Sequence, residues 1–168
     1  MKKSFTIKQF DEEDIDEVTL INWTCLPEHY TKYFILKINQ RFPQAFFVAL
    51  VDSQIVGYIM CRIETGLSTI KKFSIARKGH IISIAVRPNY RRIGIGKALI
   101  SKILEIALPT YKAEECFLEV RPSNKEALNL YKKFGFGQVK TINHYYRDGE
   151  SAVIMAVNIQ KKDTNKIQ

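Results

Sequence analysis

The residues best suited to chemistry lie in a short basic segment that contains two glycines. The segment Arg91-Arg92-Ile93-Gly94-Ile95-Gly96-Lys97 follows an apolar run that ends in Ile84-Ala85-Val86. Glycines let a backbone approach a ligand closely, and free amides at the start of a helix attract negatively charged oxygens. Arg91, Arg92 and Lys97 add positive charge. The segment therefore predicts a phosphate or pyrophosphate site, with tight packing at the two glycines as the structural alternative.

Two common nucleotide-binding loops do not fit this segment. A Walker A loop requires Ser or Thr after Gly96-Lys97 and a glycine five residues before Gly96, where the chain has Ala98 and Arg91. A dinucleotide fingerprint requires a third glycine at position 99, where the chain has Leu99. A different phosphate-bearing ligand is expected.

A second candidate is Glu119, the acid that interrupts the apolar run Glu115–Arg121. A charge in such a run is costly unless it is paired or functional. Glu119 is therefore either a catalytic base or a partner of a nearby Lys or Arg on the solvated side of a strand. Cys116 lies three residues earlier, so it points to the opposite face of that strand and is a poor candidate nucleophile.

Hydrophobic periodicity and turn residues predict the elements that hold these residues. The strands expected from alternating or β-rich runs are 4–10, 45–51, 54–64, 80–86, 115–121, 136–146 and 151–159. The helices expected from helical spacing are 11–26, 30–40, 94–108 and a fourth after 124. Ser123 and Glu126 predict a capping box for the fourth helix, and Gly135 predicts its C-terminal cap. Residues 66–76 read as a basic loop.

Two motifs in the right order resemble those of GNAT acetyltransferases. Arg91–Gly96 is similar to the family's Q/R-x-x-G-x-G/A pyrophosphate loop. Leu118–Phe136 is similar to its second signature, L-x-V-x-x-x-N-x-x-A-x-x-L-Y-x-x-x-G-F. The resemblance implies the GNAT fold, an α/β fold with a mixed, mostly antiparallel sheet of six to seven strands flanked by about four helices. We expect one such domain over residues 1–160 and a polar tail over 161–168.

The same resemblance implies roles for particular residues. It implies acetyl-CoA as co-substrate, with Glu119 as general base, Tyr131 as the acid that protonates the leaving thiolate and His80 as a second base or proton shuttle. The residues expected to bind the cofactor are Ile84, Ala85, Val86, Arg91, Arg92, Ile93, Gly94, Ile95, Gly96, Lys97, Asn124 and Tyr131. Taken alone, His80 would be a structural histidine, Tyr131 a core aromatic and Asn124 a helix cap. No metal is expected.

Three further segments resemble N-terminal acetyltransferases, including ribosomal-protein alanine acetyltransferases and archaeal enzymes. They are Leu26–Tyr30, Gly79–Val86 and Tyr145–Ala152, the last being close to Y-Y-x-D-G-E-D-A with Ser151 in place of Asp. The resemblance implies that protein N-termini are the substrate, with Glu28, Tyr30, Tyr145 and Tyr146 lining the peptide groove. Acetylation of lysine side chains or of a small amine is the alternative within this chemistry.

Charge and composition leave one hypothesis of another class open. The formal net charge of +9 permits a basic module that binds RNA or the ribosome, although no aromatic RNA-binding strand motif accompanies it. No apolar run reaches the length of about 18 residues that a membrane span needs. Three widely spaced cysteines suit a reducing interior, so a cytoplasmic location is expected. Ribosome association and an auxiliary subunit are possible partners.

Overall fold

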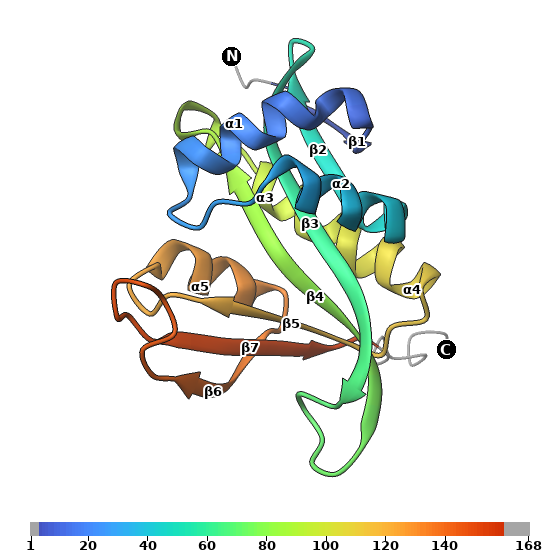
Figure 1. Cartoon of the computed structure of the whole chain (residues 1–168), viewed down its shortest axis with the longest axis vertical. Coiled ribbons are helices and arrows are strands. Elements are labelled where there is room, and N and C mark those ends of the chain that lie inside the picture. Colours follow the sequence, from blue (N-terminus) through green and yellow to red (C-terminus); the bar gives the residue numbers. More distant parts are fainter. Residues whose placement is uncertain (1–3, 160–168) are drawn as a thin grey trace, which may run out of the picture. The chain divides into compact units, whose positions relative to one another are not determined.

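Seven strands pair in the hydrogen-bonded order β1-β2-β3-β4-β5-β7-β6 in the computed structural model, which describes residues 4–159 (Figure 1). The strands are β1 (Thr6–Gln9), β2 (Phe46–Val51), β3 (Gln54–Leu67), β4 (Ile75–Val86), β5 (Glu115–Val120), β6 (Gly137–Ile142) and β7 (Ala152–Asn158). β4 and β5 are parallel, whereas the pairs β1–β2, β2–β3, β5–β7 and β6–β7 are antiparallel. The predicted mixed, mostly antiparallel sheet is confirmed.

The chain groups into two compact units. Unit 1 comprises the described residues up to 62 together with 81–110, and unit 2 comprises 63–80 together with those from 111 on. β3 and β4 each contribute residues to both units. The single domain expected over residues 1–160 stays a prediction, and the tail at 161–168 lies outside the described residues.

In unit 1, helices cover both faces of the sheet. Helices α1 (Ile15–Cys25) and α2 (Lys32–Arg41) lie on one face, and α3 (Ile95–Lys102) packs on β2 from the other (Figure 1). Successive side chains of a strand point to opposite faces of the sheet. The side chains that pack under α1 and α2 therefore alternate along each strand with those on the α3 side. The core under α1 and α2 consists of Phe10, Val18, Ile21, Ile35, Ile38, Phe46, Val48, Ile55, Tyr58, Met60 and Ala85.

The helix that follows Gly94 continues past α3 in two further segments. A π-helical segment η4 (Ile103–Ala107) leads into the short α4 (Leu108–Thr110), and the Leu108 amide donates to the Ile103 carbonyl. The helix was expected to end at residue 108, before Pro109, and it ends two residues later, at Thr110. Proline has no amide hydrogen to donate, and the wider π turn just before it has already changed the hydrogen-bond pattern.

In unit 2, α5 (Lys125–Lys133) begins at a cap that differs from the expected one. The Asn124 side chain accepts a hydrogen bond of 3.1 Å from the Ala127 amide, so Asn124 is the N-cap and the predicted Ser123–Glu126 capping box is wrong. The C-terminal prediction is confirmed. Gly135 adopts φ +87°, and the amides of Gly135 and Phe136 donate to the carbonyls of Lys132 and Tyr131. This is the Schellman arrangement, which favours glycine.

Two strand boundaries also differ from the sequence expectation. β3 and β4 extend into the expected 66–76 loop, leaving only residues 68–74 outside the strands. The extra strand residues are largely polar or exposed, so hydrophobic alternation did not reveal them. β6 ends at Ile142 instead of Tyr146, because the chain turns at His144, which has φ +52°. Tyr145 and Tyr146 therefore lie in the β6–β7 loop.

Three further features concern membranes, metals and redox chemistry. None of the helices within residues 4–159 combines the length and apolarity that a transmembrane crossing requires. Over the same range, no group of three or more His, Cys, Asp or Glu side chains could hold a metal ion. No disulfide links Cys25, Cys61 and Cys116, all of which are described.

Candidate functional site

The basic glycine segment in unit 1 forms the loop that starts α3. Gly94 is the N-cap residue with φ +100°, a conformation that side-chain-bearing residues rarely adopt, and it has no side chain to cap the first amides of the helix. Arg92 also adopts a positive φ, of 65°. The side chains of Arg91, Arg92 and Lys97 are exposed, whereas Ile95, the first residue of α3, is buried. The loop therefore presents free backbone amides and positively charged side chains at the start of α3, the two features that bind a phosphate group.

The strand end before this loop is fixed by close packing within unit 1. A Cβ atom on Gly57 of β3 would lie 2.9 Å from the Ala85 carbonyl oxygen, so only glycine lets β3 approach this part of β4. Arg87, the residue after β4, makes two hydrogen bonds: its backbone amide donates to the Val56 carbonyl, and its guanidinium donates to the Glu17 carboxylate. The end of β4, which includes Ile84, Ala85 and Val86, is thereby held in a defined position ahead of Arg91.

In unit 2, the structure brings two of the predicted catalytic residues into contact. His80 Nε2 lies 2.6 Å from Glu119 Oε2, and the side chains are only 12% and 18% exposed. Among the described residues, the ion-pair partner of Glu119 is therefore a histidine and not the lysine or arginine of the structural alternative. An ionised carboxylate can only accept, so the shared proton lies on His80 Nε2. His80 Nδ1 is buried without a hydrogen-bond partner in the described part of the chain, so the contact at Nε2 orients the ring.

The orientation of the His80 ring is fixed by aromatic stacking on the same face of the sheet. It stacks on Phe117 with ring centroids 4.4 Å apart, and Lys78 Nζ lies 4.7 Å from the centroid of the Phe117 ring. Lys78 is in turn tied to the Leu67 carbonyl at 2.9 Å. The buried carboxylate of Glu115 accepts from the Ser68 hydroxyl and the Thr69 amide, both at 2.6 Å. Glu115 and Lys78 are thus engaged in holding the β3–β4 hairpin, and Glu119 is the acid that contacts the His80 imidazole.

Tyr131 lies on α5 of the same unit. Its ring is buried, with its centroid 5.8 Å from that of Phe136. Burial raises the pKa of the Tyr131 phenol well above its usual range, so the hydroxyl keeps its proton. The structure thus joins His80 to Glu119, and it buries Tyr131 on α5 beside Phe136.

The predicted peptide-groove residues in unit 1 are held by a residue that the sequence reasoning missed. Asn22 of α1 is fully buried; its side-chain amide donates to the Glu28 carbonyl at 3.1 Å, and its side-chain oxygen accepts from the Tyr30 amide at 2.9 Å. The Tyr30 ring stacks on Phe34 with centroids 5.0 Å apart. The signal that could have revealed Asn22 is an amide on the otherwise apolar inner face of the helix.

The other two groove candidates lie in the β6–β7 loop of unit 2, which is clamped by charge. Arg121 donates to Asp148 and Glu150 at 2.8 Å each, and its guanidinium carbon lies 3.8 Å from the centroid of the Tyr146 ring. Hydrogen bonds from Ser123 and Arg121 lower the pKa of Glu150 to about 2. The Tyr145 and Tyr146 rings meet edge to face at 5.0 Å. Arg121 and Glu150 are further positioning residues that were not singled out from the sequence.

Comparison with known proteins decides which chemistry this geometry serves. A family model described as Acetyltransferase (GNAT) family matches residues 15–136, from the start of α1 to the end of the second signature. The chain belongs to the GNAT family of acetyltransferases. The acetyltransferase is an acetyl-CoA-dependent N-acetyltransferase, and the phosphate-binding expectation for its glycine loop is consistent with the pyrophosphate of that co-substrate.

Individual relatives match this acetyltransferase over nearly its whole length. It is 48% identical over 155 residues to an N-alpha-acetyltransferase of Sulfurisphaera tokodaii, covering 92% of this chain and 93% of that protein. The structure is similar to that of Ard1 from Thermoplasma volcanium, with 32% identity, a TM-score of 0.78 and coverage of 92% and 97%. It is also similar to Chaetomium thermophilum Naa20 in complex with a bisubstrate analogue, with 28% identity, a TM-score of 0.79 and coverage of 91% and 86%.

Proposed function

We propose that this acetyltransferase transfers the acetyl group of acetyl-CoA to the α-amino group of protein N-termini. The observation that carries the proposal is the 48% identity, over 92% of the chain, to a protein named N-alpha-acetyltransferase. Tyr30, Tyr145 and Tyr146 support it, because tyrosines supply apolar area and a hydroxyl for peptide groups.

In the proposed reaction, Glu119 accepts a proton from the substrate α-ammonium, directly or through one water. The amine nitrogen then attacks the thioester carbonyl carbon, forming the C–N bond; the C–S bond breaks to release the CoA thiolate, and the nitrogen gives its second surplus proton to solvent. The 2.6 Å contact with His80 orients the Glu119 carboxylate and supplies a second group that can take up the proton. No covalent intermediate with the enzyme is required.

Tyr131 is the proposed donor to the leaving thiolate. Because burial raises its pKa, the phenol is protonated throughout the physiological range. Transfer from such a phenol to a thiol of ordinary pKa, about 8.5, is uphill. Tyr131 therefore stabilises the developing thiolate first by hydrogen bonding and gives up its proton only as the sulfur leaves.

Binding of acetyl-CoA is assigned to the unit 1 loop. Arg91, Arg92 and Lys97 and the amides that follow Gly94 would hold the pyrophosphate, and the end of β4 at Ile84–Val86 would pair with the pantetheine. Asn124 is proposed to contact the pantetheine or pyrophosphate region as well, although its Oδ1 already caps α5. The cytoplasmic location, an auxiliary subunit and ribosome association stay predictions.

A panel of short peptides tests the proposed substrate. Peptides with a free α-amino group should be acetylated in the presence of acetyl-CoA, and N-acetylated peptides that contain lysine should not. Mass spectrometry of the products distinguishes the two. Turnover of the blocked, lysine-containing peptides alone would identify a lysine acetyltransferase and overturn the proposal.

A further inference from the structure

The side chain of Asn22 is buried in unit 1, yet all of its hydrogen-bonding groups are used. Its amide nitrogen donates to the Glu28 carbonyl and to the Tyr58 hydroxyl, the latter at 3.0 Å. Its oxygen accepts from the Tyr30 amide. A carbonyl can only accept and an amide N–H can only donate, so these partners fix which way the Asn22 side chain faces.

A second buried hydroxyl extends the attachment from the loop to the sheet. The Tyr58 hydroxyl of β3 lies 2.6 Å from Ser83 Oγ of β4, and both residues are buried. Burial raises the pKa of Tyr58 to about 12, so this hydroxyl stays protonated and can donate within the chain. The loop is thus tied through one amide to two neighbouring strands of unit 1.

The tie acts on residues 26–30, a segment without helix or strand that connects α1 to α2. The Asn22 backbone carbonyl accepts from the Leu26 amide at 3.2 Å, so Asn22 contacts three alternate residues of the segment: Leu26, Glu28 and Tyr30. A short loop loses its single conformation when its buried polar anchors are removed, because the freed groups must find water.

We propose that Asn22 is a positioning residue that pre-forms the Glu28–Tyr30 loop for the peptide substrate. This inference rests on the proposed function, since Glu28 and Tyr30 are groove residues only if the substrate is a peptide. A pre-formed loop lowers the entropy that the enzyme must lose on binding, so the effect appears in peptide affinity.

Two substitutions separate this role from simple packing. Asn22→Leu keeps the approximate volume and removes both side-chain bonds to the loop. Asn22→Asp keeps the acceptor for the Tyr30 amide but turns a second acceptor toward the Glu28 carbonyl. Asn39→Leu is the matched control: it makes the same change on α2 of the same unit, where the Asn39 side-chain oxygen is buried without a partner in residues 4–159.

The first measurement is amide exchange at Tyr30, which does not depend on activity. In Asn22→Leu this amide should exchange at least about tenfold faster, whereas Asn22→Asp and Asn39→Leu should keep it protected. The second is the peptide KM, which should rise about tenfold or more in both Asn22 variants with CoA affinity within about twofold of wild type. If Asn22→Leu does not fold, the peptide KM of Asn22→Asp decides the question.

The outcomes distinguish this inference from the proposed function. Wild-type protection of Tyr30 in a folded Asn22→Leu variant overturns the inference, whichever amine the enzyme acetylates. An unchanged peptide KM in Asn22→Asp overturns it as well. Failure of the wild-type enzyme to acetylate any free α-amine overturns the proposed function, and the exchange result then shows only whether Asn22 holds the loop.

Discussion

Glu119 Oε2 and His80 Nε2 lie 2.6 Å apart, so a change in either side chain alters the surroundings of the other. Because the two side chains are in contact, we expect the effects of substituting them to be non-additive. The acid and the imidazole come from β5 and β4, which pair in parallel only over Lys78–His80 and Glu115–Phe117. Their contact therefore depends on this three-residue register.

Substitution of the proposed base tests the pair directly. Glu119→Gln should lower kcat by about 10²- to 10⁴-fold, because the amide keeps the shape but cannot take a proton. His80→Gln should have a smaller effect, and the double variant should be about as slow as Glu119→Gln alone. Initial-rate kinetics measure all three, with Glu126→Gln as the same change at an exposed acid of unit 2. Unaltered turnover in Glu119→Gln would remove it from the base role.

The ends of helices and strands could be predicted where neighbouring residues determine them. They were harder to predict where contacts between residues far apart in the sequence determine them. Gly135 ends α5 as expected, because the backbone there has a positive φ, which favours glycine. The start of α5 was misassigned because Ser123 and Asn124 are both good N-caps, and the sequence does not show which one turns. Asn22 escaped notice because its three side-chain partners lie 6, 8 and 36 residues away, beyond any local pattern. Glu119 was singled out as a charge in an apolar run, which alone favoured an ion pair; its role as base came from the family resemblance and stays a prediction.

A substitution at the end of α5 tests the cap. Gly135→Ala should lower the free energy of unfolding by about 1 kcal/mol, because an L side chain disfavours φ +87°. The added Cβ would lie 3.5 Å from Val157 Cγ2, an ordinary contact, so backbone strain alone accounts for the loss. Gly66→Ala in β3 is the control, since it meets no atom within 4 Å and has no positive φ. Equal melting temperatures for the two variants would contradict this account of the cap.

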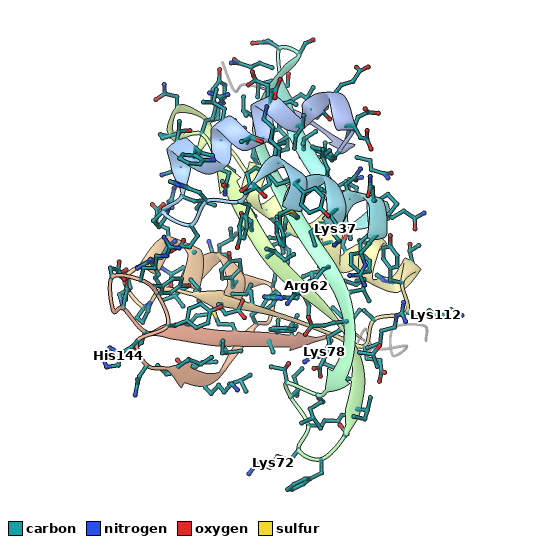
Figure 2. All side chains as sticks on the ribbon, viewed as in Figure 1. Lys37, Arg62, Lys72, Lys78, Lys112 and His144 are labelled. Atoms are coloured by element: carbon teal, nitrogen blue, oxygen red, sulfur yellow. The ribbon has the colours of Figure 1, made fainter. Side chains whose placement is uncertain are left out.

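Over the whole molecule, the formal charge of +9 raises the question of whether the basic residues act locally or as a general surface. The reversals Arg92→Glu with Lys97→Glu, and Lys71→Glu with Lys72→Glu, each lower the charge by four, from +9 to +5. Lys72 lies at the tip of the β3–β4 hairpin (Figure 2), and both hairpin lysines are exposed. The two double variants thus carry the same charge at different places.

Thermal unfolding with CoA separates local from general charge. A ligand at a hundred times its Kd stabilises the folded state by about 2.7 kcal/mol, so CoA should raise the melting temperature of the wild type. The Arg92/Lys97 variant should lose this shift, and the Lys71/Lys72 variant should keep it. Loss of the shift in both would indicate general electrostatic attraction. The absence of any shift in the wild type would contradict the proposed CoA site at this loop.

The most direct test of N-terminal acetylation is a single peptide that carries both competing amines. A peptide with a free α-amino group and one internal lysine is incubated with acetyl-CoA, and tandem mass spectrometry locates the acetyl group after partial turnover. We expect acetylation at the α-nitrogen, with the lysine unmodified. Acetyl groups found on the lysine before the α-amine would contradict the central claim.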